Sequence, residues 1–100
     1  MLTLTEHTDG STRILRLSGD LCGEGVAGLR TRLAAAVAQP THDITADLSD
    51  VTRIDGSGIG ALAFLHRRLA AAGRKLGVAG AIGQPRDCLQ DLGLARLLAA

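Results

Sequence analysis

The chain has 100 residues, of which 46% are hydrophobic and 21% charged, a balance typical of one globular domain over residues 1–100. The net charge is +1, the basic residues are scattered, and Phe64 is the only aromatic residue, which argues against nucleic-acid binding. No apolar run approaches the about 20 residues that span a membrane, and the N-terminus does not resemble a signal peptide. We therefore expect a cytoplasmic domain that is not inserted in a membrane.

Cys22 and Cys88 lie far apart in the sequence and form no C-x-x-C pair. This spacing favours two buried or half-buried thiols over a disulfide or a metal site. The three histidines also lack the close spacing of metal ligands. We expect no metal and no cofactor.

The predicted elements begin with a hairpin. Apolar and polar residues alternate over 2–7, a turn follows at 8–11, and a second strand-like run covers 13–19. From Glu24 to Ala38, apolar residues recur at helical spacing from Val26 to Val37, which predicts the first helix.

A short strand is predicted over 43–48, followed by a loop over 49–56. The second helix is predicted from about Ser57 to Ala72, where Gly73 ends it. A strand over 75–80 and a short helix over 86–90 complete the chain. Because helices alternate with strands after a hairpin, right-handed crossovers predict an α/β fold with a mixed sheet, antiparallel at first and parallel later.

The stretch from Thr52 to Leu62, TRIDGSGIGAL, holds three glycines around Ser57. It lacks the lysine of a phosphate-binding P-loop. It matches G-x-G-x-x-A of a dinucleotide site, but no carboxylate follows about 20 residues later to hold a ribose. A nucleophile elbow requires glycines two positions on either side of the serine, where this chain has Asp55 and Ile59. An enzyme is therefore the least favoured class, and we expect no catalytic residues.

Two interpretations of Ser57 stay open. In the structural one, Ser57 or Asp55 caps the second helix and the glycines allow a sharp turn. In the functional one, Ser57 presents a hydroxyl to a kinase. The two are compatible, because a phosphate at a helix N-terminus is favoured by the helix dipole and by free backbone amides.

The second helix also predicts where the aromatic ring lies. At about 100° per residue one stripe faces the sheet, formed by Ile59, Leu62, Ala63, Leu65 and Leu69. The opposite side gathers Ser57, Gly60, Ala61, Phe64 and Arg68. We therefore expect Phe64 to be exposed near Ser57 and to anchor a partner.

The segments LRLSGDL, DLSDVTRIDGSGIGAL, AAAGRKLGVAG and CLQDLGLARLL together resemble bacterial anti-sigma factor antagonists of the STAS family, from about Arg13 to Leu98. The most specific motif is D-x-S-G-x-G-x-L, matched from Asp55 to Leu62, and the turn at Gly19, Asp20 and Leu21 supports it. The resemblance implies a small STAS-like α/β domain whose serine in that motif is phosphorylated by an anti-sigma factor kinase. The ATP would be bound by the kinase and not by this chain.

By this resemblance Ser57 is the phosphoacceptor, and the unphosphorylated chain binds the anti-sigma factor. The partner-binding residues implied are Asp20, Asp55, Gly56, Ser57, Gly58 and Gly60, and the helical periodicity adds Phe64. Two positions differ from many antagonists: Gly56 replaces a second hydroxyl, and Cys22 replaces an aspartate. The chain also ends at Ala100, so we expect a final helix of the family to be missing. The alternative role is a constitutive subunit of a lipid-transport ABC complex or of a stress-signalling complex.

Overall fold

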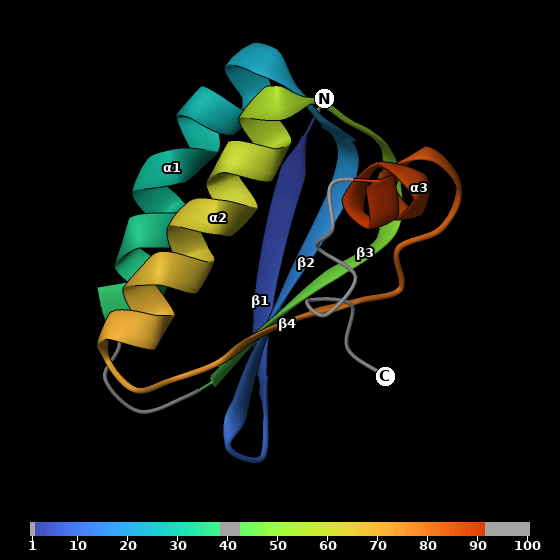
Figure 1. Cartoon of the computed structure of the whole chain (residues 1–100). Helices are drawn as coiled ribbons and strands as arrows, with labels where there is room; N and C mark the ends of the chain where they lie inside the picture. Colours follow the sequence, from blue (N-terminus) through green and yellow to red (C-terminus); the bar gives the residue numbers. More distant parts are fainter. Residues whose placement is uncertain (1, 39–42, 92–100) are drawn as a thin grey trace.

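A computed structural model describes residues 2–38 and 43–91 (Figure 1). The elements in chain order are β1 (Thr3–Asp9), β2 (Thr12–Leu21), α1 (Gly23–Ala38), β3 (Asp43–Ile54), α2 (Gly56–Ala71), β4 (Leu76–Ala79) and α3 (Gly83–Asp91). The strands form one sheet in the order β1-β2-β3-β4. β1 pairs antiparallel with β2, and the remaining pairs are parallel. The predicted mixed α/β sheet is therefore confirmed.

The third strand is longer than predicted. We expected it to end at Leu48, but β3 continues to Ile54 through most of the predicted loop. The pairing of β2 with β3 shifts register twice, between Arg16 and Ser18 and between Gly19 and Asp20. These irregularities interrupt the simple alternation of side chains, so Val51 and Ile54 both reach the core while the polar residues between them stay exposed.

Two helices, α1 and α2, cover one face of the sheet side by side, and α3 lies against the other face (Figure 1). The core lies mainly between the sheet and the helix pair, because apolar residues alternate inward along β2 and the first half of β3. Its fully buried large side chains include Leu15, Leu17, Leu21, Leu33, Ile44, Leu48, Leu62, Leu65 and Leu69. Val26, Leu29 and Leu33 of the predicted α1 stripe are buried, whereas the side chain of Val37 lies outside the described residues.

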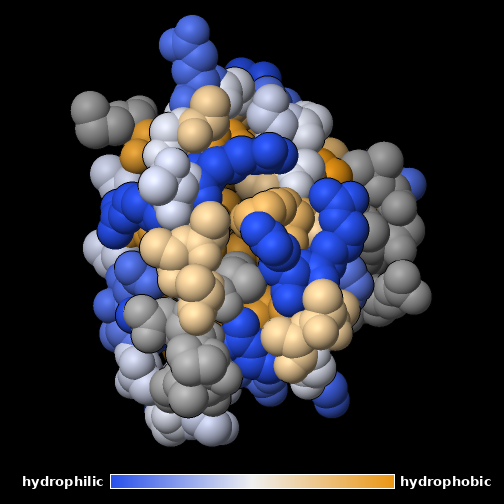
Figure 2. Space-filling view, turned by 90° about the vertical axis from the view of Figure 1, so that its left-hand side faces the viewer, coloured by the Kyte–Doolittle hydropathy of each residue, from blue (hydrophilic) through white to orange (hydrophobic). Residues whose placement is uncertain are grey.

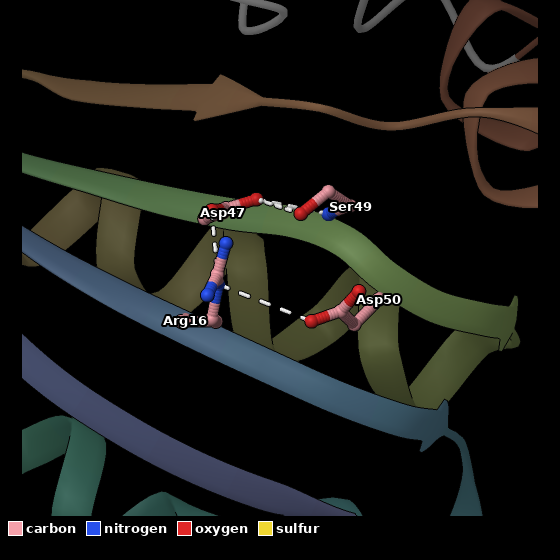
Figure 3. A network of polar contacts seen from close by, with 4 residues as sticks. All are labelled: Arg16, Asp47, Ser49 and Asp50. Carbon is pink, nitrogen blue, oxygen red and sulfur yellow. Dashed lines mark hydrogen bonds and ion pairs between the residues drawn. The ribbon is translucent and has the colours of Figure 1, made fainter.

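A polar network occupies the other face of the sheet beside β4 (Figure 3). The Arg16 Nε atom lies 3.4 Å from Asp47 Oδ2 and 3.9 Å from Asp50 Oδ2. Asp47 Oδ1 accepts hydrogen bonds from the backbone N–H and the hydroxyl of Ser49, at 2.9 and 2.7 Å. These bonds from Ser49, together with the Arg16 charge, hold the pKa of Asp47 below its ordinary value despite partial burial.

The end of α2 was predicted correctly, whereas the start of α3 was not. α2 ends near Ala72, followed by Gly73 in the left-handed conformation at φ 72°, as expected. α3 begins at Gly83, three residues earlier than predicted, with Pro85 buried in its first turn. Proline is tolerated there because the first amides of a helix have no partner within it. The expected absence of a further helix concerns residues beyond Asp91, which lie outside the described part of the chain.

Candidate functional site

The glycine-rich segment lies where two parallel strands end and two helices begin. Leu21 at the end of β2 pairs with Ile54 at the end of β3, and the Asp55 N–H donates to the Leu21 carbonyl at 3.4 Å. Each strand passes into its helix within two residues. The N-termini of α1 and α2 therefore lie side by side at one edge of the sheet (Figure 1).

Asp55 caps both helices. Its Oδ1 atom accepts hydrogen bonds from the N–H groups of Ser57 and Gly58, at 2.9 and 3.1 Å. Its Oδ2 atom accepts one from the N–H of Gly23, at 3.1 Å, at the start of α1. The structural interpretation is thus confirmed for Asp55, which is the N-cap residue. The expectation that a phosphate would find free amides here is corrected for the N–H groups of Gly23, Ser57 and Gly58, because the carboxylate already accepts from them.

Ser57 is exposed in the first turn of α2, next to the cap but not part of it. Its backbone N–H donates to the Asp55 carboxylate. Its hydroxyl forms no hydrogen bond within the described part of the chain. The serine borders an open cleft of about 310 Å³ between the two helices, lined by Gly23, Val26, Ala27, Arg30, Gly56, Ser57 and Gly60. A free hydroxyl at the mouth of a cleft is accessible to another protein.

The three glycines of the segment have different roles. Gly58 is buried, and a Cβ atom there would lie 2.6 Å from Ile54 Cγ1 and still closer to the Leu21 carbonyl oxygen. A Cβ atom at Gly56 would have nothing within 4 Å, and one at Gly60 would meet only the Arg30 guanidinium, at 3.9 Å. Gly58 therefore permits close packing of α2 on the strand ends, whereas Gly56 and Gly60 keep the cleft open.

Asp20 lies at the same sheet edge but does not line this cleft. Its carboxylate accepts a hydrogen bond from the Thr52 hydroxyl at 2.6 Å.

Cys22, two residues after Asp20, is half-buried. Burial raises the pKa of the Cys22 thiol above its ordinary value; the Asp55 and Asp20 carboxylates raise it further, and Arg53 opposes them. The thiol is thus held in its neutral, weakly nucleophilic form.

Gln84 supports the site from α3, and no sequence pattern pointed to it. Its Oε1 atom accepts from the Ile54 N–H at 2.8 Å, and its Nε2 atom donates to the Ile54 carbonyl at 2.9 Å. This pair of bonds holds the residue that precedes Asp55. A glutamine in a short helix gives no sequence signal for such a contact, because the partner is backbone that is distant in the chain.

Phe64 is half-buried, so the prediction of an exposed ring was wrong. The guanidinium groups of Arg30, from α1, and Arg68, from α2, lie 5.8 and 5.4 Å from its centroid. Ala61, which we placed on the outward side, is buried, whereas Ala63 is half-buried. The buried stripe of α2 is centred nearer Gly58 and Ala61 because α1 packs beside this flank of the helix.

Figure 2 shows the face that carries α1 and α2, where strongly hydrophilic side chains border patches of apolar surface. Helix α2 contributes Arg67 and Arg68 and has no acidic residue along its length.

Within residues 2–38 and 43–91, no group of three or more His, Cys, Asp or Glu side chains could hold a metal ion. No helix of that part is both long and apolar enough to cross a membrane.

The mixed four-stranded sheet and the motif from Asp55 to Leu62 agree with the match to a protein-family profile. The family profile described as "Mlab, STAS domain" matches residues 4–99. The chain belongs to the STAS domain family. No curated protein sequence matches it.

Several solved structures have the same fold. The unphosphorylated form of the anti-sigma factor antagonist SpoIIAA matches with a TM-score of 0.84 and 21% identity, over 97% of this chain and 86% of that one. An anti-sigma factor antagonist from Mycobacterium paratuberculosis matches with a TM-score of 0.87 and 20% identity, over 98% and 83%. A sulfate transporter family protein from Wolinella succinogenes matches with a TM-score of 0.72 and 18% identity, over 93% and 75%.

Proposed function

We propose that this STAS domain is a phosphorylation-switched anti-sigma factor antagonist, which binds an anti-sigma factor kinase while Ser57 is unphosphorylated. The observation that carries the proposal is the free, exposed Ser57 hydroxyl beside a cap that Asp55 completes without it. A hydroxyl with no structural task can be modified without unfolding the helix. The likeness to SpoIIAA, solved in unphosphorylated and phosphorylated forms, adds support.

In this function the kinase transfers the γ-phosphoryl group of ATP to the Ser57 oxygen, which releases ADP and the hydroxyl proton. The modification adds about −1.5 to −2 charges at neutral pH. It places them between Asp55 and a helix face whose charged residues are mostly basic. A partner surface that complements the unmodified face is then repelled or displaced.

Incubation with an anti-sigma kinase of the same organism and ATP, followed by mass spectrometry, tests this assignment. We expect one phosphate, on Ser57, and none on the Ser57→Ala variant. Phosphate on other residues only, or none with a kinase shown to be active on another substrate, would contradict it.

The second candidate is a constitutive subunit of a transport or signalling complex. The profile description, which names Mlab, and the match to a sulfate transporter family protein favour it. Gly56 and Cys22, which differ from many antagonists, favour it as well. A constitutive subunit predicts that the wild type and Ser57→Ala bind the partner equally and that no phosphate is found on Ser57 in cells.

A further inference from the structure

The cleft beside Ser57 contains one charged side chain. Of the residues that line it, five are Gly, Ala or Val, one is Ser57 and one is Arg30. Arg30 projects from α1, across the cleft from the serine. Within the described residues it forms no ion pair with a carboxylate, and its contact is with the Phe64 ring.

At this helix end, three backbone amides and the Asp55 carboxylate already pair with each other, which weakens the attraction for a phosphate on Ser57. The amides of Gly23, Ser57 and Gly58 already donate to the Asp55 carboxylate. That carboxylate would also repel the new charge. Arg30, the one charged residue among the described residues that line the same cleft, is therefore the group that could pair with the phosphate.

Arg30 and Ser57 line the same cleft, and the Arg30 side chain lies close to α2. Its guanidinium lies 3.9 Å from where a Cβ atom of Gly60 would stand. Gly60 follows Ser57 by three residues, a rise of about 4.5 Å along the helix. No side chain stands at Gly60 or Gly56 to block the path. Rotation of the flexible Arg30 side chain would move its guanidinium along the cleft toward Ser57.

We infer that Arg30 is the phosphate-binding residue of this domain: it stacks on Phe64 in the unmodified form and moves to the phosphate when Ser57 is phosphorylated. The inference rests on the proposed phosphorylation of Ser57. Phosphorylation then changes the surface at two places, because it adds a phosphate at Ser57 and removes one guanidinium from the Phe64 ring. Arg68, which also stacks on Phe64 but does not line the cleft, stays in place.

The test uses protein in which phosphoserine is incorporated at position 57 during translation, so that no kinase is needed. The pKa of the phosphate is measured by ³¹P NMR in the wild type, Arg30→Gln and Arg68→Gln. A bound guanidinium favours the dianion, so the wild type should have the lowest pKa, and Arg30→Gln should raise it by about 0.5 unit. Asp55 is present in all three proteins, so its repulsion cancels.

Arg68→Gln is the matched control, because it removes the same charge and a similar ring contact from outside the cleft. It should leave the phosphate pKa nearly unchanged. The ring protons of Phe64, the only Phe, Tyr or Trp, should shift on phosphorylation in the wild type and much less in Arg30→Gln. Equal phosphate pKa values in the wild type and Arg30→Gln, or an equal rise in Arg68→Gln, would overturn the inference. A kinase that ignores Ser57 would instead refute the proposed function and leave this result standing.

Discussion

Gly58→Ala should destabilise the domain although alanine is the better helix former. The added Cβ atom would lie 2.6 Å from Ile54 Cγ1, 3.0 Å from Leu21 Cγ and still closer to the Leu21 carbonyl oxygen. That oxygen belongs to the end of β2 and accepts from the Asp55 N–H, so it cannot move without disturbing the strand ends. Relief of such crowding costs about 1–3 kcal/mol, against a gain of about 1 kcal/mol from helix propensity.

We expect a net loss of up to about 2 kcal/mol, which for a domain of this size lowers Tm by up to roughly 15 °C. Thermal and urea unfolding can be followed by far-UV circular dichroism, because the chain has no Trp or Tyr. Gly60→Ala is the control, since its Cβ atom would make only one ordinary contact, with Arg30 at 3.9 Å. It should be neutral or stabilising by up to about 1 kcal/mol. Equal stability of the two variants would refute the packing role of Gly58.

Three further predictions concern single side chains. Asp55→Ala removes a carboxylate that caps both helices, so it should lower the free energy of unfolding, measured in urea, by about 1–2 kcal/mol. Asp20→Ala removes one exposed hydrogen bond from a hydroxyl and should cost much less. Equal losses in the two variants would contradict the capping of both helices by Asp55. Because folding lowers the pKa of Asp47, its stabilisation is present above about pH 4 and is lost as the pH falls through the lower folded value, so acid should destabilise the wild type more than Asp47→Asn. Parallel acid unfolding curves would refute this. Phe64→Ala should weaken partner binding at least about tenfold in calorimetry, because an aromatic side chain at an interface centre carries much of the affinity. Since the ring is half-buried, a melting curve must show that the variant is folded at the assay temperature; unchanged affinity of the folded variant would show that the ring lies outside the interface.

The sequence predicted the elements well where their periodicity is simple. The hairpin, α1, α2 and the glycine that follows α2 emerged from apolar spacing and turn residues. The end of β3 did not, because Ser49, Asp50, Thr52 and Arg53 have the composition of a loop. Their exposure beside a strand with two register shifts allows them to continue a sheet, and no local pattern shows this.

The site was predicted in part. The sequence identified the Asp55 and Ser57 motif but could not distinguish which of them caps α2, since either residue type is a good N-cap. The roles of Gln84 and Arg30 depend on contacts with segments about 30 residues away. The exposure of Phe64 was misjudged for the same reason: the periodicity of one helix does not indicate where its neighbour packs.

Whether phosphate on Ser57 switches binding is tested most directly by calorimetry. An anti-sigma kinase of the same organism, without ATP, is titrated with the unmodified chain and with the chain that carries phosphoserine at position 57. Melting curves of both forms establish that the fold is retained. We predict that the unmodified chain binds at least about tenfold more tightly, a difference of about 1.4 kcal/mol. Equal affinity of two folded forms would contradict the switch and favour a constitutive subunit.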